Sequence, residues 1–280
     1  MEQRHFGSTG RRVAVIGQGT WNIEQGDRRA AVAAVRHGLD LGIMHIDTAE
    51  MYGSGAAEEI VAEAIAGRRA EAFIVSKVLP TNASRKGTVA ACEKSLARLK
   101  IDHLDCYLLH WPSRHPLDGT IAAFEQLKSD GKILSWGLSN FDVGGLEDAQ
   151  KIAGVGRIAC NQVLYHLQER AIEHAVISWC AKNNVAVVAY SPFGQNDFPG
   201  AATPGGRVLS EIAAAHKASP RQVALAFLTR EKNLLAIPKA VAPSHVKDNA
   251  AAGDLTLSDI DIHKIDVAFP LGRSRELPTL

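Results

Sequence analysis

Short apolar runs alternate with amphipathic stretches along nearly the whole chain. The apolar runs are continuous, without a polar residue at every second position, and this is typical of parallel strands that are buried on both faces. The stretches between them carry apolar residues at helical spacing, and several end at a glycine. This alternation predicts a parallel sheet that is covered by helices.

The pattern contains eight strand–helix units. Strands are predicted at residues 17–20, 43–46, 72–77, 103–110, 133–138, 157–163, 185–190 and 234–237. Helices are predicted at 27–39, 56–66, 84–99, 117–129, 143–153, 172–183, 207–217, 220–230 and 244–252, and an extra helix at 258–268 closes the chain. Eight units predict a closed (β/α)8 TIM barrel, with a small β-hairpin at residues 4–14 before it. No linker or low-complexity tract interrupts the pattern, so residues 1–280 are predicted to be a single domain.

Composition and charge exclude several classes of protein. Hydrophobic residues make up 46% of the 280 residues and charged residues 22%, which is enough apolar material for a core without disulfides or a structural metal. Lys and Arg number 31 against 30 Asp and Glu, so the net charge of +1 gives no basic face for nucleic acid or an anionic membrane. The four cysteines form no CxxC pair, and no metal site is predicted. The chain begins without the apolar core of a signal peptide and has no run long enough to cross a membrane, so a cytoplasmic protein is expected.

Polar residues gather at the carboxyl ends of the predicted strands, which is where functional residues lie in such barrels. Asp47 follows the second strand, with Tyr52 just beyond it, and Lys77 and His110 end the third and fourth strands. The later strands are followed by Ser139, Asn140, Asn161, Gln162, Tyr190, Ser191 and Lys239. Each residue alone has a structural explanation, such as a helix cap or a solvated strand end. Their convergence on one barrel mouth indicates a site.

Tyr52, Lys77, Asp47 and His110 together form a candidate general acid. A lysine beside a tyrosine favours the phenolate, so Lys77 is expected to lower the pKa of Tyr52 from about 10 toward the working range. Asp47 would keep Lys77 charged and oriented, and His110 could hydrogen-bond a carbonyl oxygen. The set could protonate an oxygen that is becoming negative.

The motifs around these residues resemble those of the aldo-keto reductase family along the whole chain. Residues 46–53 (IDTAEMYG) and 108–112 (LLHWP) are similar to two signatures of the family. Residues 137–141 (GLSNF), 161–162 (NQ) and 189–192 (AYSP) resemble its nicotinamide-binding segments, and 237–239 (IPK) resembles the segment that holds the 2′-phosphate. This family binds its dinucleotide extended across the barrel mouth. That binding mode explains why the segment with Gly17 and Gly19 has neither the third glycine nor the following helix of a Rossmann fingerprint.

The resemblance implies a role for each residue. Tyr52 would donate the proton to the carbonyl oxygen, with Lys77 lowering its pKa, Asp47 pairing with Lys77 and His110 orienting the carbonyl. Hydride would come from C4 of a reduced nicotinamide. The residues expected to bind the cofactor, NADP(H), are Gly19, Thr20, Trp21, Ser139, Asn140, Gln162, Tyr190, Ser191, Lys239, His245, Asp248 and Asn249.

Two positions depart from the family pattern near the cofactor's 2′-phosphate. The family has a serine after Ile-Pro-Lys and an arginine several residues later, where this chain has Ala240 and His245. A neutral histidine cannot make the bidentate contact of an arginine with a phosphate. Since Lys239 is present, NADP(H) is still expected, with weaker discrimination against NAD(H).

Short loops predict an open mouth and a small substrate. The connection at residues 111–118 and the tail at 270–280 are both short, which suits small aldehydes and dicarbonyls. Residues expected to contact the carbonyl substrate are Trp21, Met51, Tyr52, His110 and Trp111, with Phe193 as a further candidate. For the aromatic residues, simple packing between loops is an equal alternative. The resemblance is greatest to bacterial members that reduce methylglyoxal and similar short carbonyls.

Three functions follow from these observations. The leading one is NADPH-dependent reduction of small aldehydes or ketoaldehydes to alcohols by a monomer. The second is a nucleotide-sensing regulatory protein on the same fold. The third is a metal-dependent barrel hydrolase using His45, Asp47, His103 and His110. Strand alternation from His110 places His103 on the opposite face, which argues against this last hypothesis.

Overall fold

The apolar runs form a parallel sheet in which nearly every residue is buried. The computed structural model describes residues 1–279. Eight strands follow one another around the sheet in chain order, namely β3 Gln18–Gly19, β4 His45–Asp47, β5 Phe73–Val78, β6 Cys106–Leu109, β7 Trp136–Ser139, β8 Ile158–Leu164, β9 Ala186–Tyr190 and β10 Leu234–Ala236. All residues of β5 and β8 are buried, as expected for strands covered on both faces.

Hydrogen bonds between the first and last strands close this sheet into a barrel. Gly17 N donates to Ala236 O (2.7 Å), and Gly19 N donates to Pro238 O (3.1 Å). A Cβ atom at Gly19 would lie 2.6 Å from the carbonyl oxygen of Ile237, so the closure requires glycine at this position. The predicted (β/α)8 barrel is confirmed.

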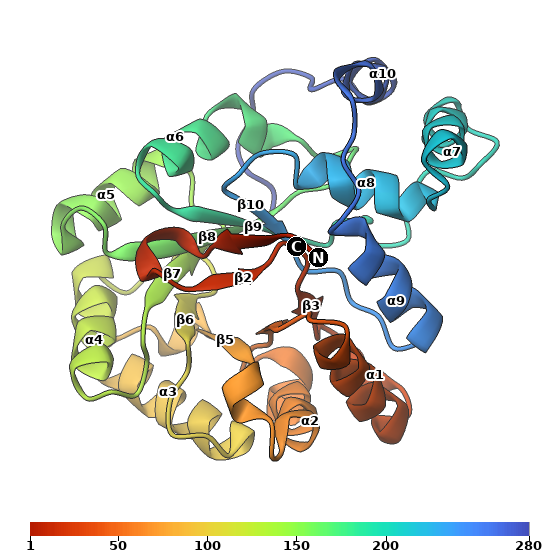
Figure 1. Ribbon diagram of the computed structural model, residues 1–280. Coiled ribbons are helices and arrows are strands. Elements are labelled where there is room, and N and C mark those ends of the chain that lie inside the picture. The colour runs from red at the N-terminus through yellow and green to blue at the C-terminus, as the bar shows by residue number, and fades with distance from the viewer. Residues whose placement is uncertain (280) are drawn as a thin grey trace.

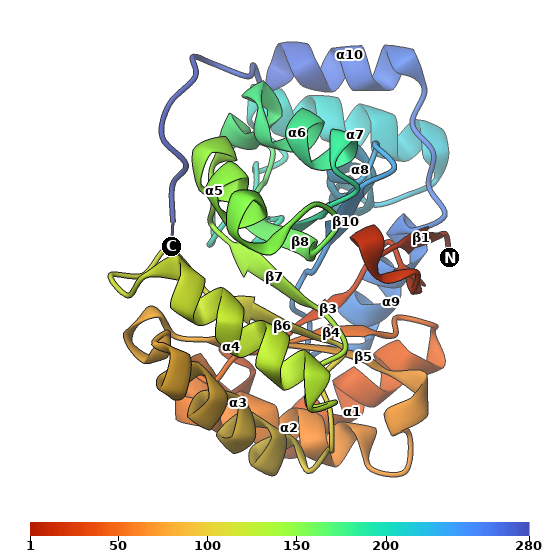
Figure 2. The ribbon, with the colours of Figure 1, turned by 90° about the vertical axis from the view of Figure 1, so that its left-hand side faces the viewer.

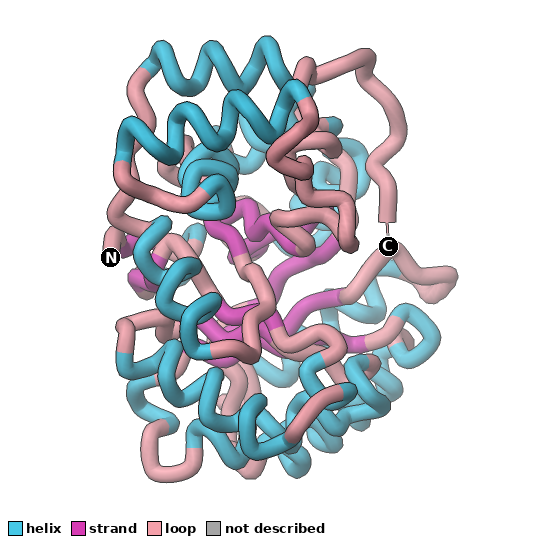
Figure 3. Tube along the Cα trace, turned by 90° about the vertical axis from the view of Figure 1, so that its right-hand side faces the viewer, coloured by secondary structure: helices cyan, strands magenta, loops and turns pink. Residues whose placement is uncertain are grey.

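Helices surround the barrel (Figures 1 and 3). They are α1 Arg28–Asp40, α2 Ala56–Ile65, α3 Arg85–Leu99, α4 Leu117–Ser129, α5 Val143–Ala153, α6 Val176–Lys182, α7 Pro204–His216, α8 Pro220–Leu228, α9 Pro243–Ala252 and α10 Asp259–Ala268. Several begin at a capping side chain, because Asp27, Ser84 and Asp142 each accept a hydrogen bond from a backbone N–H of the first turn. The extra helix α10 packs against α7.

The predicted helix at 172–183 is wrong in its first turn. The structure has a short 3₁₀ turn, η6 Ala171–His174, and then α6, with Ala175 between them at φ −151°. Glu173 in this turn accepts hydrogen bonds from Tyr165, Arg170 and Arg230. These tertiary contacts fix the turn against its helical propensity.

A hairpin covers the end of the barrel opposite the strands' carboxyl ends. It consists of β1 Gln3–His5 and β2 Arg12–Ala14, which pair antiparallel. Between them Phe6 is fully buried, with its ring centroid 5.4 Å from that of His45 and 4.7 Å from that of Phe73. Figure 2 shows the hairpin at one side of the molecule and the stretch after α10 at the other. Within residues 1–279, no helix is both long enough and apolar enough to cross a bilayer.

Candidate active site

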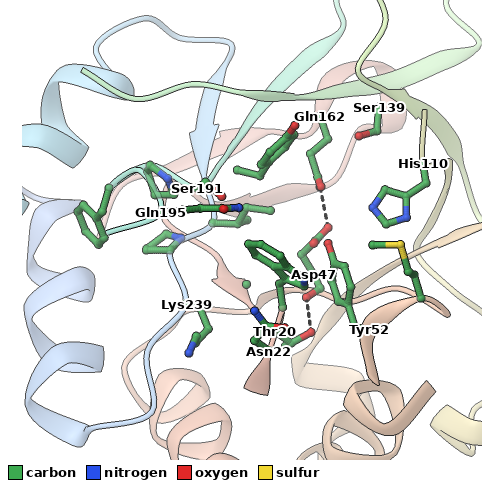
Figure 4. A pocket seen from close by; sticks show the side chains of 18 of the residues that line it. Thr20, Asn22, Asp47, Tyr52, His110, Ser139, Gln162, Ser191, Gln195 and Lys239 are labelled. Atoms are coloured by element: carbon green, nitrogen blue, oxygen red, sulfur yellow. Dashed lines mark hydrogen bonds between the residues drawn. The ribbon is translucent and has the colours of Figure 1, made fainter. Parts of the chain in front are cut away.

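A pocket of about 460 Å³ opens at the carboxyl ends of the strands. Most of the predicted site residues line it. Its lining includes Gly19, Thr20, Trp21, Asp47, Met51, Tyr52, His110, Trp111, Ser139, Asn140, Gln162, Tyr190, Ser191 and Lys239. Figure 4 shows Asp47, Tyr52 and His110 on one side of this pocket and Lys239 on the other.

Lys77 lies behind the pocket wall and is fully buried. Its ammonium group donates to three oxygens: Asp47 Oδ1 (2.6 Å), Thr48 O (2.9 Å) and Tyr52 Oη (3.1 Å). An ammonium has three N–H donors, so each has one acceptor. The arrangement fixes the lysine and directs one N–H at the Tyr52 hydroxyl.

Asp47 holds both of its carboxylate oxygens in hydrogen bonds. Oδ1 accepts from Lys77, and Oδ2 accepts from Gln162 Nε2 at 2.7 Å (Figure 4). Thr20 Oγ1 donates to the backbone carbonyl of Asp47 at 2.9 Å. Burial raises the pKa of Asp47, while Lys77 and Gln162 oppose that shift.

The pKa of Tyr52 is raised above its ordinary value, so the expected net lowering by Lys77 is wrong. Burial of the phenol is the largest cause, and the nearby charge of Lys77 offsets only part of it. Burial also opposes the charge of Lys77, but Asp47 and Tyr52 outweigh it and raise the pKa of Lys77. Tyr52 is therefore a protonated phenol beside a charged ammonium, which is a suitable arrangement for a proton donor.

A tight turn after Tyr52 holds its ring against the pocket. Gly53, Ser54 and Gly55 all have positive φ values of 55°, 53° and 96°. A Cβ atom on Gly53 would lie 2.5 Å from Glu24 Cγ, so a larger residue would have to displace the Glu24 side chain. The sequence Tyr-Gly-Ser-Gly thus reverses the chain directly after Tyr52 and leaves only 9% of the Tyr52 surface exposed.

His110 is a neutral imidazole at the pocket floor. Burial, assisted by the charge of Lys77, lowers the pKa of His110 to about 2. Its ring centroid lies 5.8 Å from that of Tyr52 and 4.8 Å from that of Trp111. Nδ1 has no hydrogen-bond partner within residues 1–279. A neutral ring at this position can donate a hydrogen bond to a substrate oxygen.

Amide and hydroxyl groups form the wall on β7 and β8. Asn140 Nδ2 donates to His110 O (3.0 Å) and to Ser139 Oγ (3.1 Å), and Asn140 Oδ1 accepts from Tyr190 Oη (2.9 Å). Asn140 and Ser191 both have left-handed backbones, with φ values of 63° and 48°. Strained residues of this kind are concentrated at functional sites, where the surrounding structure holds them.

The far end of the pocket is less complete than the sequence predicts. Lys239 lines the pocket and is exposed, but His245, Asp248 and Asn249 are outside its lining. The carboxylate of Asp248 is held at the start of α8, where Ser219 Oγ and Gln222 Nε2 donate to it at 2.8 and 2.9 Å. His245 is exposed on α9, and Asn249 is buried.

Trp21 and Met51 lie at the mouth, with 38% and 37% of their surfaces exposed, and Trp111 lies beside His110. Pro192, Ile237 and Pro238, from two of the predicted cofactor-binding segments, also line the pocket, whereas the sequence did not predict Asn22, Gly194, Gln195 and Asn196. Most of these are in loops without periodicity. The only available signal was the Gly-Gln-Asn run after the β9 strand.

The four residues of the metal-hydrolase hypothesis do not meet. His45 lies in the barrel interior against Phe6, and His103 pairs with Asp102 near the surface. Across the described chain, residues 1–279, no three His, Cys, Asp or Glu side chains are grouped as a metal site would require.

Comparison with known proteins agrees with this geometry. Residues 15–268 match the model of the aldo/keto reductase family. The chain is 42% identical over 262 residues to the methylglyoxal reductase YeaE of Escherichia coli, covering 93% of this chain and 92% of that protein. It is 34% identical to the glyoxal reductase of Bacillus subtilis, covering 90% and 87%. A crystal structure of an aldo-keto reductase from Klebsiella pneumoniae in complex with NADPH superposes with a TM-score of 0.93 at 38% identity, covering both chains fully. The chain belongs to the aldo/keto reductase family and is an oxidoreductase.

Proposed function

We propose that this protein reduces small aldehydes and 2-oxoaldehydes to alcohols with NADPH, using Tyr52 as the proton donor. The observation that carries the proposal is the hydrogen bond between Lys77 Nζ and Tyr52 Oη beside the neutral ring of His110. The relatives named as methylglyoxal and glyoxal reductases support short carbonyl compounds as the substrate class.

The residues lining the pocket fit a nicotinamide dinucleotide. Polar groups of Ser139, Asn140 and Gln162 lie at one end, where a carboxamide could bind, and the cationic Lys239 lies at the other, where a phosphate could bind. When bound, NADPH supplies a hydride to the carbonyl carbon. The related Klebsiella pneumoniae structure that contains NADPH supports the same cofactor here.

The protein's own residues handle the proton and the substrate. His110 donates a hydrogen bond to the carbonyl oxygen and orients it toward Tyr52. As the carbonyl carbon gains the hydride, the oxygen becomes negative and takes the hydroxyl proton of Tyr52. The phenolate left behind is 3.1 Å from the Lys77 ammonium, which stabilises it until solvent returns a proton. Trp21, Met51 and Trp111 form the apolar rim that receives a short side chain. We also propose that the protein acts as a cytoplasmic monomer.

Replacement of Tyr52 by Phe tests this role. It removes the donated proton and keeps the ring, so kcat for methylglyoxal or glyoxal should fall by about 10²–10⁴-fold. The dissociation constant for NADPH, measured by tryptophan fluorescence, should stay the same. Turnover near that of the wild type would overturn the assignment of Tyr52.

A further inference from the structure

Gln162 makes a hydrogen bond across the barrel that links the cofactor wall to the proton-donating residues. Its strand, β8, is four strands from β4 in the closed eight-stranded barrel, so the two strands face each other. Gln162 Nε2 nevertheless lies 2.7 Å from Asp47 Oδ2, and the side chains meet in the interior (Figure 4). Both residues are almost fully buried, with 2% and 1% of their surfaces exposed.

The chemistry of the pair fixes the orientation of the amide. A carboxylate only accepts hydrogen bonds, so the nitrogen of Gln162 must face Asp47. Within residues 1–279 no group donates to Gln162 Oε1, and the side chain lines the pocket. The oxygen therefore remains available as an acceptor for an N–H donor of a bound ligand.

Three hydrogen bonds then connect this amide to the reacting phenol. Gln162 donates to Asp47 Oδ2, Lys77 donates to Asp47 Oδ1, and Lys77 donates to Tyr52 Oη. Without Gln162, one oxygen of a buried carboxylate would have no donor. Such an oxygen favours protonation or rotation of the group, and either change releases Lys77.

We propose that Gln162 is a positioning residue that holds Asp47 ionised and oriented, in addition to any contact with the cofactor. Through Asp47 it keeps the Lys77 ammonium directed at Tyr52. This inference rests on the proposed function for its kinetic consequence, whereas its effect on Asp47 is a property of the protein without ligand.

Two substitutions of opposite character test the proposal. Gln162→Met keeps the approximate volume and removes the donor. Gln162→Glu keeps the shape, donates to Asp47 only while its carboxyl is protonated, and repels Asp47 once it ionises. The Gln162→Met variant should therefore need a higher pH to ionise Asp47. The Gln162→Glu variant should need a lower pH to keep its new carboxyl protonated and hydrogen-bonded to Asp47.

The first measurement uses ligand-free protein labelled with ¹³C at the Asp carboxyls, with the Asp47 signal assigned by Asp47→Asn. Because a hydrogen bond to a charged group is lost, Gln162→Met should raise the Asp47 titration midpoint by about one pH unit, a change of about tenfold in its acid dissociation constant. Gln18→Met is the matched control, since the buried Gln18 amide donates only to the carbonyls of Val35 and Ile43. It should leave the Asp47 midpoint unchanged.

The second measurement is the pH profile of kcat for aldehyde reduction. Gln162→Met should move the acid limb to higher pH, whereas Gln162→Glu should retain turnover at acid pH and lose it as pH rises. An unshifted Asp47 midpoint and two unshifted profiles, with only the NADPH dissociation constant changed, would overturn the proposal and leave Gln162 as a cofactor ligand alone. A wild type that reduces no aldehyde would instead overturn the proposed function, and the carboxyl titration would still decide the role of Gln162.

Discussion

At one end of the pocket Lys77 and Asp47 are almost inaccessible, with 0% and 1% of their surfaces exposed, and every N–H of Lys77 has an acceptor. At the other end Lys239 is exposed, and His245 is exposed on α9 beyond the pocket lining. The pocket thus has a buried end, where hydrogen bonds fix the side chains, and an end that is exposed to solvent.

This contrast has a physical consequence for what can change. Charges in a buried network depend on one another, so removal of one leaves another without compensation. Charges at an exposed surface are screened by water and contribute little each. Substitutions at the buried end should therefore abolish chemistry and stability together, whereas substitutions at the exposed end should adjust cofactor preference alone.

The largest effect is expected for Lys77→Met. It leaves the Asp47 carboxylate buried with only Gln162 as a side-chain donor, and loss of one partner of a buried pair costs roughly 3–5 kcal/mol of unfolding free energy. Urea unfolding at neutral pH measures this cost. Aldehyde reduction should fall to the level of Tyr52→Phe or below.

A second substitution separates stability from chemistry at this end. Adding Asp47→Asn to Lys77→Met removes the uncompensated charge, so most of the lost unfolding free energy should return. Activity should not return, because no ammonium stabilises the Tyr52 phenolate. A double variant as unstable as Lys77→Met would show that packing, and not charge, dominates there.

Acid should destabilise the buried region through its histidines. Burial lowers the pKa of His45 to about 3 and that of His110 to about 2, whereas both would titrate near 6.5 in the unfolded chain. Below pH 6.5 these two histidines bind protons in the unfolded chain but stay neutral in the folded protein. The free energy of unfolding that is present above pH 6.5 is therefore lost as pH falls toward the pKa values of the folded protein. Each histidine should account for about 2 kcal/mol between pH 6.5 and 5.

Unfolding by urea at pH 7, 6 and 5 measures this slope, and His45→Phe should flatten it by one histidine's share. An unchanged slope in that variant would mean that other groups control acid stability. In the folded enzyme kcat should show no ionisation of His110 between pH 5 and 8, because the ring stays neutral throughout.

The smallest effect is expected at the exposed end. His245→Arg supplies a fixed charge with a bidentate fork for the 2′-phosphate of NADPH, which NADH lacks. Because the site is hydrated, NADPH should bind only about two- to fivefold more tightly, with NADH unchanged. Fluorescence titration with both cofactors measures the difference.

His263→Arg is the matched control, since it makes the same replacement on the exposed surface of α10. Equal tightening of NADPH and NADH in His245→Arg, or tightening of NADPH in His263→Arg, would contradict a specific site at the far end.

The sequence predicted the barrel because eight apolar runs and the capping residues between them are local signals. It also predicted Asp47, Tyr52, Lys77 and His110, since the ends of parallel strands must meet at one face.

The sequence did not predict the hydrogen bond from Gln162 to Asp47, which joins residues 115 positions apart and depends on barrel curvature. The net direction of the Tyr52 pKa was missed for a similar reason, because burial cannot be read from neighbours in the chain. The turn η6 followed side-chain contacts of Glu173 in place of helical periodicity.

The closure between Gly17, Gly19 and residues 236–238 also governs when the site can exist. During synthesis on the ribosome, Tyr52, Lys77 and His110 emerge early, but their pocket lacks one wall until β10 has left the exit tunnel. Contacts between segments more than two hundred residues apart must form last, and such distant pairing is slow. A nascent chain that already carries Tyr52, Lys77 and His110 but lacks β10 would thus have an incomplete pocket. The catalytic surface would become complete only near the end of translation.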